Sequence, residues 1–114
     1  MASWPDLKAV RSFLRQDPDA AQDALIDAAR TAAIDYGQQR LGRDLLTGEL
    51  RYPTDTTTLP DACYQACLIH ASRLYRRRDS LDGTVWFGDG AGRIASRDPD
   101  VREMYDVYAP VVFG

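Results

Sequence analysis

The sequence has few of the residues that build metal sites, and it has no long apolar run. Its 114 residues include two cysteines and one histidine. A structural zinc site usually takes four ligands, so the chain is short of them. No apolar stretch approaches the ~20 residues needed to span a bilayer, and no signal-like apolar segment stands near the N-terminus. These absences predict a protein of the reducing cytoplasm with no membrane contact, no metal and no cofactor.

Lysine is nearly absent as well, because Lys8 is the single lysine and every other basic residue is arginine. Arginine favours bidentate pairing with carboxylates and phosphates, which suits protein interfaces and nucleic acid alike. The formal net charge of -3 argues against a dedicated nucleic-acid binder. A chain of 114 residues is one domain by size, long enough to bury a core of its own.

A proline followed by aspartate recurs along the chain, at residues 5–6, 18–19, 60–61 and 99–100. Proline suits the first helical position, and aspartate suits the positive end of the helix dipole. The pattern predicts four helices, over about residues 5–15, 18–41, 59–78 and 98–108. We therefore expect an all-α fold: a small four-helix bundle with a long loop at 43–58, a glycine-rich loop before the fourth helix and an extended C-terminal tail. Residues 1–110 form the helical domain and 111–114 the tail.

The helix at 59–78 is predicted to be the buried centre of this bundle. At 3.6 residues per turn its apolar side chains cover most of the circumference, and only a narrow polar strip remains. Cys63, Cys67 and His70 share one face at i, i+4 and i+7. They could be read as metal ligands or as a Cys/His nucleophile pair, but the chain has no further cysteine or histidine, and buried cysteines are usually inert. We predict that all three are core residues.

The helix at 18–41 has two apolar stripes. The first is expected to face the core, and its members are mostly alanines: Ala21, Ala24, Leu25, Ala28, Ala32 and Tyr36. The second is weaker and consists of Ile26, Ala33 and Gly37 beside Arg30. Two stripes expose more apolar surface than an isolated monomer would leave in water, so the second is predicted to form a subunit interface.

Two further patterns suggest binding chemistry. Arg76, Arg77 and Arg78, with Arg73, Arg93 and Arg97 nearby, could follow a nucleic-acid backbone, although positive charge also suits a helix C-terminus. The glycines of FGDGAGR lack the Lys-Ser/Thr of a P-loop, so they indicate a turn. No carboxylate pair with a partner base stands out, and we expect no enzyme activity.

The order and spacing of these elements resemble the head-to-tail connector, or adaptor, proteins of long-tailed bacteriophages. The likeness covers most of the chain. It runs through LKAVRSFL, then DALIDAARTAAIDYGQQRLGR, then a variable loop, then LPDACYQACLIHASRLYRRRDS. It ends with FGDGAGRIASRDPDVREMYDVYAP, which is similar to the C-terminal part of connectors from actinobacterial phages.

The resemblance implies a structural virion protein, assembled in the bacterial host cytoplasm and located in the neck between capsid and tail. It implies a ring of about twelve copies that docks on the portal protein, receives a stopper or tail-completion protein, and lets DNA pass without specific binding. By analogy with the family, the residues expected to contact the portal are Tyr105, Tyr108, Val111, Val112 and Phe113. Subunit contacts would include Trp86 and Phe87 with the second stripe. The alternatives are a small helical DNA-binding or packaging-associated protein, based on the arginines, and a small enzyme that uses Cys67 and His70.

Overall fold

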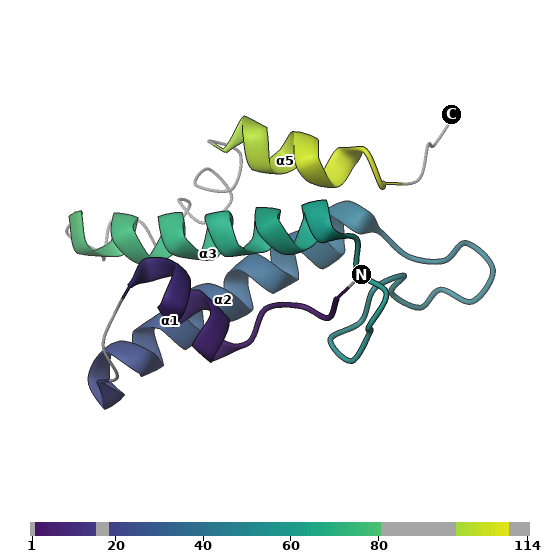
Figure 1. Ribbon diagram of the computed structural model, residues 1–114. Helices are drawn as coiled ribbons and strands as arrows, with labels where there is room; N and C mark the ends of the chain where they lie inside the picture. Colours follow the sequence, from purple (N-terminus) through teal and green to yellow (C-terminus); the bar gives the residue numbers. More distant parts are fainter. Residues whose placement is uncertain (1, 16–18, 81–97, 110–114) are drawn as a thin grey trace.

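Four helices make up the regular structure of the chain. The computed structural model describes residues 2–15, 19–80 and 98–109. Within these ranges it contains α1 (Leu7–Leu14), α2 (Ala20–Leu41), α3 (Asp61–Ser80) and α5 (Pro99–Asp106), and no strand (Figure 1). The predicted all-α fold with four helices is confirmed. No helix of the described part is long and apolar enough to cross a membrane.

α3 is the centre of the molecule, as the sequence predicts. It contacts α1, α2 and α5, and it lies between α5 on one side and the α1–α2 pair on the other (Figure 1). Side chains are buried around most of its circumference between residues 63 and 75, whereas its C-terminal turns are rich in arginine. The buried side chains include Cys63, Ala66, Cys67, Leu68, His70, Ala71, Ser72 and Tyr75.

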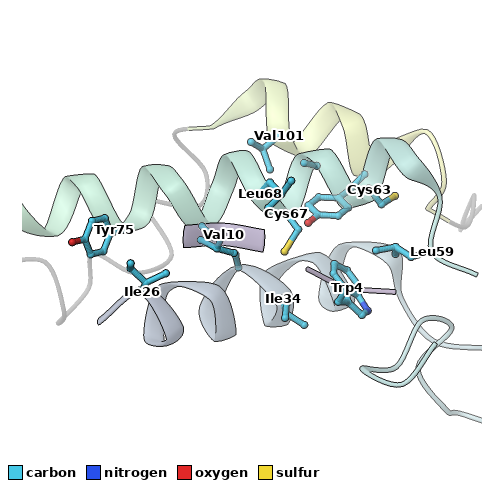
Figure 2. Close-up of a cluster of buried hydrophobic side chains, with 14 of the residues drawn as sticks. Trp4, Val10, Ile26, Ile34, Leu59, Cys63, Cys67, Leu68, Tyr75 and Val101 are labelled. Carbon is cyan, nitrogen blue, oxygen red and sulfur yellow. The ribbon is translucent and has the colours of Figure 1, made fainter. Parts of the chain in front are cut away.

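The core fills the space on both sides of α3. Figure 2 shows Val10 and Ile26 in the region between α3 and α2, and Val101 of α5 beside Leu68. Trp4, which precedes α1, is also buried, and its indole Nε1 donates to the carbonyl of Tyr52 at 3.0 Å. All four helices and the segment before α1 therefore contribute to one core.

The Pro-Asp pairs mark helix starts, although not in the predicted register. α1 and α2 begin one residue after the aspartate, and the carboxylates of Asp6 and Asp19 accept hydrogen bonds from the amides of Ala9 and Ala21. The expectation that proline occupies the first helical position is wrong for these two helices, because aspartate can satisfy a free N–H there and proline cannot. α3 begins at Asp61, one residue after its proline, so the prediction is wrong there too. α5 begins with its proline, Pro99, as predicted.

Candidate functional site

The α2 face predicted to meet a neighbouring subunit lies inside the molecule. Ile26 and Ala33 have no exposed surface, and Gly37 is buried. Arg30 beside them is half-buried and donates to the carboxylate of Asp27 at 2.9 Å and to the carbonyl of Pro5 at 3.2 Å. Burial contradicts the assignment of Ile26, Ala33 and Gly37 to a subunit interface, since a second subunit cannot reach them without opening the core. It does not apply to Arg30, whose side chain is 26% exposed.

The stripe predicted to face the core is mostly on the outside of α2. Leu25 and Tyr36 are partly buried, whereas the alanines of this stripe are exposed: Ala21, Ala24, Ala28 and Ala32. Burial of a side chain stabilises in proportion to its apolar area, by about 0.8 kcal/mol per methylene. The bulky residues of α2, Ile26, Ile34 and Leu41, gain more from burial than alanines do, and they determine which face turns inward.

Gly37 leaves room for two aromatic rings that pack against α2. A Cβ at this position would lie 2.7 Å from Cη2 of Trp4 and 2.7 Å from the hydroxyl oxygen of Tyr105. Both rings are buried, so neither can move freely away. The core needs the space that a side chain would fill, and this requirement explains a glycine within α2, about one turn before its C-terminal end.

We expect Gly37→Ala to lower the free energy of unfolding by about 1–2 kcal/mol, because overpacking of a core typically costs ~1–3 kcal/mol and exceeds the ~1 kcal/mol gained in helix propensity. Urea denaturation would measure the change. In a Trp4→Phe background the ring is shorter, so the same substitution should cost less. An equal or greater stability of Gly37→Ala would show that the rings do not restrict this position.

Tyr105, predicted to contact the portal, is part of the core. It has no exposed surface, and its ring centroid lies 6.1 Å from that of Tyr36 and 6.4 Å from that of Trp4. Burial raises the pKa of its hydroxyl far above the ordinary value. The portal-contact assignment of Tyr105 is wrong for this reason, whereas Tyr108 is more than a third exposed. The other residues assigned to contacts, Trp86, Phe87, Val111, Val112 and Phe113, lie outside the described residues.

Cys63, Cys67 and His70 are buried as predicted, and both cysteines are free thiols. Burial raises the pKa of Cys63 to about 11 and that of Cys67 to about 12, so the reactive thiolate form is scarce at neutral pH. The enzyme alternative requires Cys67 and His70 to be exposed, and they are not. Within the described ranges, no group of three His, Cys, Asp or Glu side chains is placed to hold a metal ion.

The arginine cluster is partly neutralised by acidic residues at the start of α5. Arg77 donates both guanidinium nitrogens to the buried Asp98 at 2.8 and 2.6 Å. Arg73 reaches Asp98 at 3.1 Å and makes a two-pronged pair with Asp100 at 2.8 Å. Arg76 is exposed, while Arg93 and Arg97 fall outside the described part of the chain. Two arginines of the predicted nucleic-acid patch therefore hold α5 against α3.

The loop after α2 is ordered by its own hydrogen bonds. Gly42 ends α2, and the chain then turns back so that Asp44 and Glu49 pair through the backbone at 2.8 Å. The Asp44 carboxylate accepts from the amides of Leu46 and Thr47 at 2.7 and 3.3 Å. The first part of the loop predicted at 43–58 is therefore a short turn closed by an isolated antiparallel bridge between Arg43 and Leu50.

Two adjacent leucines project from the tip of this turn. Leu45 is 91% exposed and Leu46 is 96% exposed. Single exposed apolar side chains are common on protein surfaces, but an adjacent pair on an ordered loop leaves apolar area in water with no local benefit. We call residues 43–51 the leucine loop.

The leucine loop is bonded to the C-terminal end of α5. One guanidinium nitrogen of Arg51 donates to the carbonyl of Leu41 at 3.1 Å and to that of Tyr108 at 3.0 Å. Arg40, in the last turn of α2, pairs with Asp106. The loop and the end of α5 therefore lie side by side at one end of the molecule (Figure 1).

Exposed apolar side chains gather at this end. Among the described residues, the large exposed hydrophobic side chains other than Phe13 are Leu45, Leu46, Val107 and Tyr108. We call these four residues the apolar end. Val107 is 77% exposed just beyond the last turn of α5, and it has no cover from the leucine loop. The apolar end is the surface best suited to contact another protein.

Comparison of the chain with protein-family models, with curated proteins and with solved structures found no match.

Several residues of this arrangement have weak sequence signals. Leu45 and Leu46 stand beside a Thr-Gly turn, and an apolar pair next to a turn residue is a usable sign of exposure. Tyr108 follows Val101 by seven residues, so its spacing places it on the buried face of α5 and gives no sign of its exposure. Val107 lies off that face, so its exposure agrees with the spacing. Asp98 is recognisable as a helix start, but nothing local indicates that Arg73 and Arg77 reach it.

Proposed function

We propose that the protein is a head-to-tail connector of a long-tailed bacteriophage. In this proposal about twelve copies close into a ring on the portal protein, and a stopper or tail-completion protein binds below. The DNA passes through the ring without specific binding. The observation that carries the proposal is the apolar end, because a small helical core that exposes four large apolar side chains at one end is suited to assembly with other proteins.

Two other features support a structural role. The order of helices and loops follows the resemblance, with a short first helix, a long second helix, a loop and a central third helix. The thiols and the single imidazole are used in packing, so the described residues offer no reactive group on the surface at these positions. Arg73 and Arg77 are two of the arginines on which the DNA-binding alternative is based, and both are paired with the buried Asp98.

The experiment is reconstitution with the portal protein encoded in the same genome. The two proteins are expressed together, purified as a complex and imaged by electron microscopy. A ring of this chain on the portal supports the proposal. Absence of a complex, or affinity for duplex DNA in the range of specific binders with a steep salt dependence, would overturn it.

Removal of the residues after Pro110 tests the predicted tail. We expect the shortened chain to keep its helix content and melting temperature, because a segment of four residues buries too little area to offset the entropy cost of ordering it. We expect portal binding to weaken about tenfold, since an extended segment with an aromatic anchor can add backbone hydrogen bonds and fill a pocket. Circular dichroism and a binding titration would measure the two effects. Normal portal binding, or unfolding, would remove the tail from the interface.

A further inference from the structure

We propose that the apolar end is a single docking surface on which the leucine loop and the end of α5 engage the same protein partner. Its occupant is an apolar groove on that partner, and this inference rests on the proposed function, in which the partner is the portal. Sequence alone separates the loop at 43–58 from the C-terminal residues and gives no reason to assign them to one partner. The structure brings the two segments together.

The first argument is that the surface is rigidly built. Arg51 joins the loop to the carbonyl of Tyr108, and Arg43 donates to the carbonyl of Gly48 at 2.9 Å, which closes the turn under the two leucines. Arg40 and Asp106 add a second connection between α2 and α5. A surface that is ordered before binding loses little conformational entropy when it docks, so its apolar area can contribute to affinity.

The second argument concerns the shape of the surface. Exposure above 90% means that the side chains of Leu45 and Leu46 stand out from the rest of the molecule. A projecting apolar tip is covered effectively only by a concave surface, and two such tips placed against each other would bury little area. A symmetric contact between two apolar ends is therefore disfavoured, and a groove on a different protein fits better.

The third argument concerns charge, and it separates a protein partner from a membrane. A loop that inserts into an anionic membrane needs an excess of basic residues around its apolar tip. At the apolar end Arg40 is paired with Asp106, and Arg43 and Arg51 donate to backbone carbonyls. Asp44 and Glu49 are exposed in the same loop. This balance lacks the positive excess that lipid binding requires.

The test uses the full chain with Leu45→Ser and Leu46→Ser together. Both side chains are almost fully exposed, so the melting temperature should change by less than about 3 °C. Portal binding should weaken about tenfold or more, because apolar anchors at the centre of an interface carry most of its energy. The matched control is Phe13→Ser in α1, which removes an exposed apolar side chain away from the apolar end and should leave binding unchanged.

The possible results separate this inference from the proposed function. Portal binding by the unaltered chain and equally by the double variant overturns the inference and leaves the proposed function intact. No portal binding by the unaltered chain overturns both. Self-association of the isolated chain that disappears in the double variant would assign the surface to a second copy, and leucine-dependent sedimentation with phosphatidylserine vesicles would assign it to a membrane. Either of these results also overturns the inference.

Discussion

Replacement of Asp98 with asparagine should lower the free energy of unfolding by about 3 kcal/mol, which is typical of the loss of one member of a buried ion pair. The Asp98 side chain is 2% exposed and receives hydrogen bonds from Arg73 and Arg77. Asparagine has nearly the same shape, but it carries no charge and turns an amide N–H₂ toward cationic donors. The variant keeps the packing and loses the pairing, so its instability measures the electrostatic contribution.

The loss of stability in Asp98→Asn depends on how much hydration the two arginines regain. The side chains of Arg73 and Arg77 are 37% and 27% exposed, so each can regain part of its hydration when Asp98 is neutral. This recovery places the cost at the lower end of the range for fully buried pairs. Chemical denaturation with a common slope would give the difference in stability.

Asp100→Asn is the matched control, because Asp100 pairs with the same Arg73 through two 2.8 Å contacts. The Asp100 side chain is 57% exposed, and exposed ion pairs contribute little to stability. We expect almost no change from this substitution. Equal losses from the two variants would show that burial of Asp98 is not what makes its pairing important.

Acidification should destabilise the folded protein through His70, by about 3 kcal/mol in total between pH 6.5 and 4. His70 is 1% exposed, and its ring lies edge-on against Tyr36 with centroids 4.8 Å apart. Neither ring nitrogen has a hydrogen-bond partner among the described residues. Burial lowers the pKa of His70 from 6.5 to about 4. The Asp98 carboxylate opposes this shift, and the guanidinium groups of Arg77 and Arg73 add to it.

The direction of this pH effect depends on whether the folded or the unfolded chain binds the proton. Between pH 6.5 and 4 the unfolded chain protonates its histidine and the folded chain does not, so stability falls as the pH falls. The contribution is complete above pH 6.5, where the imidazole is neutral in both states. Below pH 4 both states are protonated and the loss no longer grows.

The His70→Leu variant separates the protonation of His70 from the titration of carboxylates. The variant and the unaltered chain have the same carboxylates, so their titration cancels in the comparison. At pH 7 the variant should be within about 1 kcal/mol of the unaltered chain, because an apolar side chain replaces a buried polar group that has no hydrogen-bond partner in the described part of the chain. The difference in stability between the two proteins should then shift in favour of the variant as the pH falls to 4. A difference that stays constant over this range would show that His70 does not titrate in the folded core.

The sequence was sufficient to predict the helices because their signals are local. Proline and aspartate mark the starts, Gly42 marks the end of α2, and the apolar circumference of α3 identifies the central helix. The burial of Cys63, Cys67 and His70 follows from that same circumference. Each of these inferences depends on neighbours within one or two turns.

The faces of α2 could not be predicted in the same way. Alanine is a strong helix former that is tolerated on either side, so a stripe of alanines carries little information about burial. The presence of Gly37 inside depends on Trp4 and Tyr105, which are distant in sequence. The pairing of Asp98 with Arg73 and Arg77 is likewise a property of the tertiary arrangement. The sequence predicted a long loop at 43–58, which contains the leucine loop, but it did not predict the exposure of Leu45 and Leu46.

The packing at Gly37 also determines when this chain can finish folding. Trp4 precedes α1 and Tyr105 belongs to α5, and both meet the same glycine near the C-terminal end of α2. α2 and α3 are neighbours in sequence and can pair early, but their shared core stays open until Trp4 and Tyr105 arrive. Such contacts between distant residues slow folding, because the loop-closure entropy must be lost before they form. During synthesis the core can therefore close only after α5 has left the ribosome.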